Sequence, residues 1–238
     1  MKPESISKPK RFCGLTPAQT AHQDAAENKT KHSNYMQYKH QLFRSLAAGC
    51  VFASLGASVS NLRAEDAPAP KAKLPFTVYD DKGSANNHYI ASGWMGNTKA
   101  VKMDEGCTNN PHGGKSCLRF EYSAAADWAG IVWQDPANDW GDLAGGYDLT
   151  GAKKLQFWAR GDKGDETVTF KFGILGPDKN HPDSASGDSG TIKLTKEWTE
   201  YTIDLEGKDL THIKTGFVWS LAGQGKSLDF YLDDIRFE

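Results

Sequence analysis

The chain has 238 residues, of which 11 % are aromatic and 24 % are charged, a composition that is ordinary for a globular protein of one or two domains. Nine of its 28 basic residues but only three of its 30 acidic residues precede position 65, so the remainder holds 27 acidic against 19 basic residues. An acidic surface repels a phosphate backbone, and we therefore exclude nucleic acid as a partner.

The N-terminal region has the pattern of a targeting segment. Residues 1–35 are polar and unpatterned, so we expect either disorder or a start codon assigned too early. Residues 36–64 have a basic start, an apolar stretch and a small residue at the end, which is typical of a secretory signal peptide. The stretch is too short and too rich in Gly and Ser for a membrane anchor, the alternative. Cys50 in "LAAGC" weakly resembles a lipoprotein cleavage box, which leaves lipidation open.

These features predict a secreted or periplasmic protein with no stable membrane insertion after the signal is removed. Residues 65–73, "EDAPAPKAK", form a linker rich in Pro and Ala, which we expect to be extended and mobile. Residues 74–238 then form the globular domain. Polysaccharide is the partner we expect for this domain, with an extracellular or periplasmic protein as a further candidate.

Short apolar stretches in residues 74–238 alternate with polar residues and are separated by clusters of Gly, Asp and Asn. This two-residue period predicts strands at 76–81, 116–123, 128–135, 154–161, 167–175, 191–194, 198–205, 213–221 and 228–237. No convincing helical period lies between them. The pattern predicts an all-β fold, an antiparallel two-sheet β-sandwich.

Two cysteines in the globular domain, Cys107 and Cys117, enclose the turn-rich segment "TNNPHGGKS". In an exported protein such a pair predicts a disulfide that closes the loop, which would stabilise the fold by about 2–3 kcal/mol. His112 lies between them, but a zinc site would need further ligands.

The last predicted strand contains an interruption. Its apolar residues alternate from Leu228 to Leu232 but resume out of phase at Ile235. If the first period continues, Asp234 of the pair Asp233–Asp234 points into the core, where a lone carboxylate is very costly. We therefore expect one of the two carboxylates to have a neutralising partner and the other to lie near water.

Signatures of catalysis are weak in this chain. It has no G-x-S-x-G elbow and no E-x-D-x-x-E pattern of a sandwich glucanase, and its histidines are scattered. Acidic candidates such as Glu105, Glu121 and Glu200 are more simply explained as solvated surface charge. We expect a protein that is not an enzyme. The alternatives are a lyase or glycosidase on the same scaffold, or a protein-interaction module that uses the long polar loop 176–190.

The seven tryptophans, all beyond position 90, suit carbohydrate binding, because a flat aromatic ring stacks on the apolar face of a pyranose. Trp158 lies on the strand face opposite Leu155 and Phe157, together with Gln156 and Arg160. The predicted contacts are ring stacking by Trp158, Trp133 and Trp140 and hydrogen bonding by Gln156, Arg160 and Lys171. Packing in the core is the alternative for each tryptophan.

The stretch "GYDLTGAKKLQFWARGDKGDETVTFKFGI" resembles the central strand pair of the jelly-roll, or galactose-binding-like, carbohydrate-binding modules. "WTEYTIDL" and the closing "FYLDDIRFE" resemble two further strands of these modules, and the modules of family 11 are the most similar in character. The resemblance covers nearly all of residues 75–238. It implies a jelly-roll sandwich that binds carbohydrate without catalysis.

The same resemblance implies a structural calcium ion between the first and last strands. Its ligands on this chain would be Asp80 or Asp81 from the first strand and Asp233 or Asp234 from the last. Carboxylates on neighbouring strands are suitable calcium ligands. A surface pair with an Arg236 salt bridge is the alternative.

Overall fold

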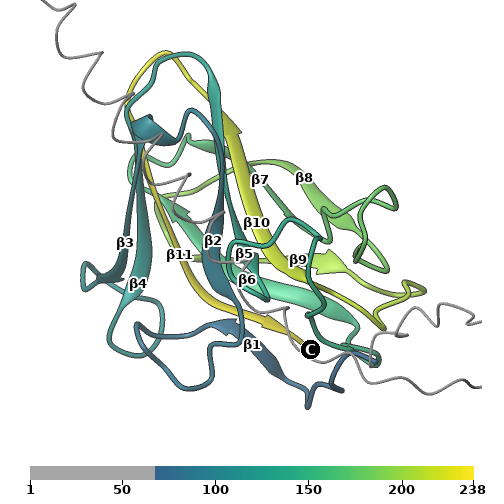
Figure 1. Cartoon of the computed structure of the whole chain (residues 1–238). Helices are drawn as coiled ribbons and strands as arrows, with labels where there is room; N and C mark the ends of the chain where they lie inside the picture. Colours follow the sequence, from purple (N-terminus) through teal and green to yellow (C-terminus); the bar gives the residue numbers. More distant parts are fainter. Residues whose placement is uncertain (1–67) are drawn as a thin grey trace, which may run out of the picture. The chain divides into compact units, whose positions relative to one another are not determined.

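The computed structural model describes residues 68–238 (Figure 1). The predictions for residues 1–35 and 36–64, for Cys50 and for the first part of the linker lie outside the described residues. Within residues 68–238, no helix is both long and apolar enough to cross a membrane.

The described part of the chain is an antiparallel β-sandwich of two sheets (Figure 1). The first sheet has the order β3-β4-β11-β6-β9, and β1 pairs with the second half of β11. Its strands are β1 (Phe76–Tyr79), β3 (Val101–Cys107), β4 (Cys117–Tyr122), β6 (Lys154–Gly161), β9 (Thr199–Asp204) and β11 (Leu228–Phe237).

The second sheet has the order β2-β5-β10-β7-β8. Its strands are β2 (Ile90–Gly96), β5 (Trp128–Gln134), β7 (Thr167–Phe172), β8 (Gly187–Lys193) and β10 (Thr215–Ala222). One short 3-10 turn, Thr98–Ala100, precedes β3. The sandwich confirms the predicted fold class.

Every predicted strand is present, but the sequence analysis missed β2 and β3. β2 reads "IASGWMG", and its two glycines and an irregular register with β5 hide the alternation. β3 reads "VKMDEGC" and lies at the edge of the first sheet, where most of its residues are exposed or half-buried. Neither strand therefore shows a clean two-residue period.

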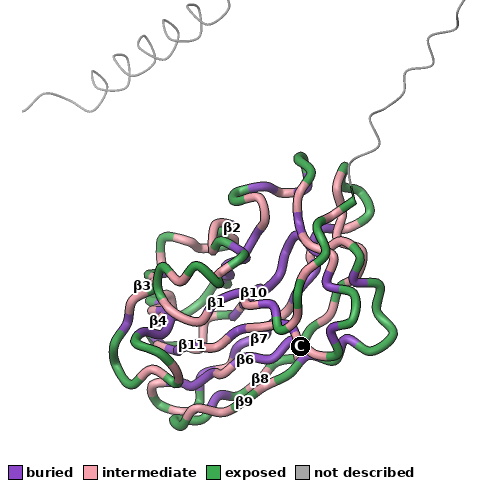
Figure 2. The backbone as a smooth tube through the Cα atoms, turned by 90° about the horizontal axis from the view of Figure 1, so that it is seen from below, coloured by how far each residue is buried: buried purple, intermediate pink, exposed green. Residues whose placement is uncertain are grey.

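Buried residues concentrate on the strands of the two sheets (Figure 2), and the core between the sheets is rich in aromatic rings. Phe157 from the first sheet packs against Phe170 and Phe217 from the second, with ring centroids 4.6 and 5.2 Å apart. Trp219 packs at 5.0 Å from Phe120 across the same interface. Burial of this many large apolar side chains is the main source of stability for a domain of this size.

A β-bulge explains the interrupted period of β11. Asp233 pairs with Trp158 and Arg236 with Gln156, so β11 has one residue more than β6 over this interval. Asp234 has a φ of 46°, in the left-handed region, and absorbs the extra residue. Ile235 therefore faces the core together with Leu228, Phe230 and Leu232, and the expectation that Asp234 would point into it is wrong.

Cys107 and Cys117 lie directly opposite each other in β3 and β4. Both are buried, and the structure holds them as free thiols rather than as the predicted disulfide. The Cys117 thiol donates a 3.5 Å hydrogen bond to the carbonyl oxygen of Cys107, and burial raises the pKa of Cys117 to about 12. The two residues are thus neighbours across the β3–β4 strand pair, and the disulfide between them stays a prediction.

Candidate functional site

The residues predicted to contact sugar lie in four separate places, one of which is the loop with Trp140 described below. Trp158, Gln156 and Arg160 are on the outer face of the first sheet, as their shared strand face predicted. Lys171 is on the outer face of the second sheet. Trp133 lies between the sheets, only 2 % exposed, with its ring 5.5 Å from that of Phe217. A sugar cannot stack on a buried ring, so the assignment of Trp133 is corrected to the core.

The protein itself covers Trp158. The imidazole of His112, from the segment between β3 and β4, stacks on the Trp158 ring with centroids 3.8 Å apart and planes 16° apart. His112 is held there by its backbone N–H, which donates to Asp233, and by its ring Nδ1, which lies 2.6 Å from Asp234. One face of the predicted platform is thus already stacked by a side chain of the same chain.

The two polar neighbours of Trp158, Arg160 and Gln156, also contact other residues of the protein. Arg160 is 8 % exposed, lies over the ring of Tyr231 at 3.6 Å and donates to the carbonyl oxygen of Asn109 at 2.9 Å. Gln156 is 4 % exposed and accepts a 2.6 Å hydrogen bond from Lys154. Neither group can turn to a ligand without losing these contacts.

The outer face of the second sheet has a different chemistry. One row of paired residues crosses four strands and consists of small or hydroxyl side chains: Gly130, Ser220, Thr169 and Thr191. The hydroxyl oxygens of Thr169 and Thr191 are 3.2 Å apart. A β-carbon on Gly130 would come within 2.7 Å of the Trp219 carbonyl oxygen, so glycine is favoured here and no side chain projects from the sheet at this position. Such a row offers neutral donors and acceptors to sugar hydroxyls.

Trp128 borders this row at the start of β5. Its side chain shares a hollow of about 300 Å³ with Thr167, Thr169, Thr191 and Ser220. The residue is 50 % exposed, which is unusual for so large an apolar side chain. A half-exposed indole can stack on the apolar face of a sugar ring while neighbouring hydroxyl side chains bond the hydroxyl groups of the sugar.

A second hollow, of about 490 Å³, lies further along β7 at the opposite end of the face. It is lined by Lys171, by Asp188, which pairs with Lys171 across the strands, and by the loop that follows β7. The two hollows thus follow one another along β7 and β8, with a charged pair in the second.

Trp140 lies in residues 135–146, which we call the β5 loop, and is half-buried there. A buried ion pair anchors this loop: the Lys214 ammonium contacts the Asp139 carboxylate and the carbonyl oxygen of Leu143. Burial acts to raise the pKa of Asp139, but Lys214 and three backbone N–H groups lower it on balance. Trp140 is therefore carried by a well-anchored loop at the end of the second sheet.

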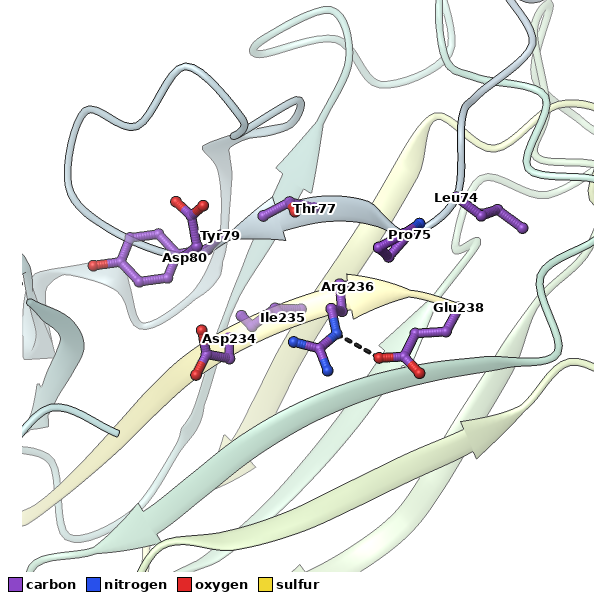
Figure 3. A pocket seen from close by; sticks show the side chains of 9 residues that line it. All are labelled: Leu74, Pro75, Thr77, Tyr79, Asp80, Asp234, Ile235, Arg236 and Glu238. Carbon is purple, nitrogen blue, oxygen red and sulfur yellow. Dashed lines mark hydrogen bonds and ion pairs between the residues drawn. The ribbon is translucent and has the colours of Figure 1, made fainter. Parts of the chain in front are cut away.

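A larger hollow, of about 630 Å³, lies over β1 and β11 (Figure 3). Asp80, Asp234, Arg236 and Glu238 line it, and Arg236 and Glu238 form an ion pair with each other. Large size alone does not make this the sugar site, because its lining lacks an exposed tryptophan and its charges are partly paired. It does bring one acid of each predicted calcium pair to the same hollow.

The other two acids bind backbone N–H groups. Asp81 accepts from Lys115 and Ser116, and Asp233 accepts from His112 and Gly113. Asp233 is fully buried beneath this segment, and burial raises its pKa to about 6, whereas Asp234 is half-buried. Asp233 is thus the buried acid of the pair, and Asp234 is the one that shares a hollow with Asp80 and lies nearer to water.

Carboxylate oxygens are the kind of donor that calcium prefers. Within residues 68–238, however, no group of three or more His, Cys, Asp or Glu side chains is arranged to hold a metal ion. The calcium ion therefore stays a prediction.

Sequence analysis missed Trp128 as a site residue. In β5 both sets of alternate residues are apolar, so the alternation shows that Trp128 and Trp133 face opposite sides without showing which side is the core. The signal that was available is the position of Trp128 at the first residue of its strand, directly after the polar residue Asp127.

The family model described as "Carbohydrate binding domain 30" matches residues 75–238. Among solved structures, the family 30 module of a cellulosomal cellulase of Clostridium thermocellum is 14 % identical, with a TM-score of 0.46 over 70 % of this chain and 98 % of that chain. The family 11 module of the same organism, solved with a β-1,3-1,4-mixed-linked tetrasaccharide, is 14 % identical, with a TM-score of 0.43 over 70 % and 96 %. No curated protein matches the chain.

Proposed function

Because the chain belongs to the carbohydrate binding domain 30 family, whose members are non-catalytic carbohydrate-binding modules, we propose that it binds a polysaccharide on the outer face of the second sheet. The observation that carries this assignment is Trp128, half exposed beside a row of hydroxyl side chains. In this proposal Trp128 stacks on a sugar ring, and Thr169, Thr191 and Ser220 bond its hydroxyl groups.

The hollows favour an extended ligand. They follow one another along β7, so a chain of several sugars can contact both Trp128 and Lys171. The charged pair of Lys171 and Asp188 offers one donor group and one acceptor group to the same ligand. The first sheet contributes no stacking residue to this proposal, since His112 covers Trp158.

Affinity electrophoresis tests the proposed function. We expect the wild-type protein to be retarded in gels that contain a soluble polysaccharide such as mixed-linked β-1,3-1,4-glucan, and a panel of neutral and acidic polysaccharides defines the ligand. A protein that is retarded by none of them, and that releases reducing ends from one, would instead support the enzyme alternative.

The calcium ion remains part of the proposal. What supports it is the concentration of charge around residues 112–116, where Asp81, Asp233 and Asp234 all make contacts. A bound cation would offset their repulsion and raise the melting temperature. Thermal unfolding in calcium and in EGTA is the test. An unchanged melting temperature would remove calcium from the proposal and leave the glycan site unaffected.

Export and the disulfide complete the proposal. A signal in residues 36–64 would direct the protein to an oxidising compartment, where Cys107 and Cys117 face each other across two strands. N-terminal sequencing of the secreted protein would locate the cleavage, and its intact mass with and without reductant would show whether the two thiols are joined. A mass that increases by two hydrogen atoms on reduction, one for each thiol formed, is the expected result.

A further inference from the structure

Two loops meet at the end of the second sheet. The β5 loop, residues 135–146, follows β5, and residues 173–186, which we call the β7 loop, follow β7 and line the larger of the two sugar hollows. They touch directly, because the His181 N–H donates to the Gly141 carbonyl oxygen at 3.0 Å. A β-carbon on Gly141 would come within 2.7 Å of the Lys179 side chain, so the approach is close.

His212 bridges the same two loops through its ring. Its Nδ1 lies 2.8 Å from the carbonyl oxygen of Pro182 in the β7 loop, and its Nε2 lies 2.7 Å from the carbonyl oxygen of Gly145 in the β5 loop. The ring is held in place by the backbone of His212, which exchanges hydrogen bonds with Ser184. One half-buried imidazole thus touches both loops at hydrogen-bond distance.

The chemistry of these contacts depends on the protonation state of the ring. A carbonyl oxygen can only accept, so each ring nitrogen needs a proton to make its bond. A neutral imidazole carries one N–H group and can satisfy one of the two carbonyls, whereas the imidazolium ion satisfies both. Protonation of His212 therefore adds one loop-to-loop hydrogen bond, and a charged donor makes that bond strong.

The charged and titratable side chains of the three segments have other partners. Asp135 accepts from the Gly146 N–H, Asp139 pairs with Lys214, and Asp183 accepts from the Lys214 and Thr215 N–H groups. Asp209 accepts from Thr211. The third segment is residues 205–214, which carries His212, and the remaining groups of this kind on the three segments are Asp142, Asp178, Lys179, His181, Glu206 and Lys208. The ring of His212 itself is aimed at the two carbonyl oxygens.

We propose that His212 is a positioning residue whose protonation fastens the β5 loop to the β7 loop and so fixes one wall of the sugar-binding face. The consequence for ligand binding rests on the proposed function: glycan affinity is higher when both ring nitrogens carry a proton, so it rises as the pH falls. The fastening itself does not depend on any ligand.

Hydrogen exchange measured by mass spectrometry tests the fastening on the full chain without a ligand. We expect residues 135–146 and 173–186 to be about fivefold better protected at pH 5.5 than at pH 7.5, after correction for the intrinsic exchange rates. His212→Gln keeps one donor and should show the lower protection at both pH values. His112→Gln, on the other sheet, is the matched control and should behave as the wild type.

Affinity electrophoresis with mixed-linked β-1,3-1,4-glucan at the same two pH values gives the second readout. Tighter binding at pH 5.5, by about fivefold in the wild type and absent in His212→Gln, supports the whole proposal. No binding at either pH together with pH-dependent protection contradicts the glycan site and leaves the fastening standing. Loop protection that is independent of pH, or equally pH-dependent in His212→Gln, overturns the inference about His212.

Discussion

The two outer faces of the sandwich both carry tryptophan and polar side chains. They differ in whether those side chains already contact other residues of the protein. On the first sheet Arg119 pairs with Asp229 at 2.6 Å, and Trp158 is stacked by His112. On the second sheet Trp128 is half exposed to solvent. An aromatic residue with polar neighbours on a sheet face can thus already be in contact with other residues of the same chain. A proposal for a binding site therefore has to consider which side chains still lack such contacts.

The largest effect should come from the anchor at the end of the second sheet. Lys214→Met leaves the Asp139 carboxylate buried without its charged partner, which we expect to cost about 3–5 kcal/mol of unfolding free energy. Urea unfolding measures this. Lys171→Met, which removes a half-buried lysine from the same sheet, is the control and should change the value by about 0.5 kcal/mol or less. Equal losses in the two variants would show that the buried pair is no special anchor.

The pH dependence of that anchor has a definite sign. The pKa of Asp139 is lowered in the folded state, so its contribution to stability is present above the ordinary carboxyl pKa of about 3.9 and is lost as the pH falls below it. Urea unfolding at pH 5 and pH 3 should therefore show a larger loss for the wild type than for Lys214→Met. A variant that is equally acid-sensitive would contradict the assignment.

A pair of tryptophan variants tests the two faces directly. Trp128→Ala removes the exposed ring and should weaken polysaccharide binding by about 2 kcal/mol, or about 30-fold. Trp158→Ala should leave binding unchanged, because His112 already covers that ring. Affinity electrophoresis of both variants beside the wild type measures the difference. The reverse result, with Trp158→Ala weaker, would move the site to the first sheet.

The smallest expected effect concerns the hydroxyl row. Thr169→Val keeps the shape of the side chain but removes its hydroxyl group, which should weaken binding by about 1 kcal/mol, or about fivefold. Thr202→Val is the matched control, since Thr202 is an exposed threonine on the outer face of the first sheet. We expect no change from it by the same measurement. Equal effects on the two faces would argue against hydrogen bonding by the row.

The sequence predicted the sandwich because most strands have one apolar and one polar face, as in β6, where Leu155 and Phe157 alternate with Gln156 and Trp158. The same reasoning placed Trp158 on an outer face correctly. It placed Trp133 on the wrong side because both faces of β5 are apolar. A two-residue period identifies which residues share a face, but the core is decided by the sheet that packs against it.

Local sequence patterns could not predict the contacts that loops make. The stacking of His112 on Trp158 joins residues from segments that are distant in the sequence, and so does the bridge from His212 to Gly145. Both depend on how a loop crosses the end or face of a sheet. Turn signals such as Asn-Pro and Gly-Gly indicate that a loop is present without indicating its path.

The bulge at Asp234 has a consequence for the length of the closing strand. If Asp234 is left out of the count, the core residues of β11 follow one unbroken alternation, so Asp234 is an inserted residue that the core does not need. Its carboxylate instead lies 2.6 Å from the His112 ring. A chain shortened by this one residue would keep its hydrophobic pattern and lose a tether of the segment that covers Trp158. The insertion thus serves the outside of the sandwich, by helping to keep one of its two faces closed.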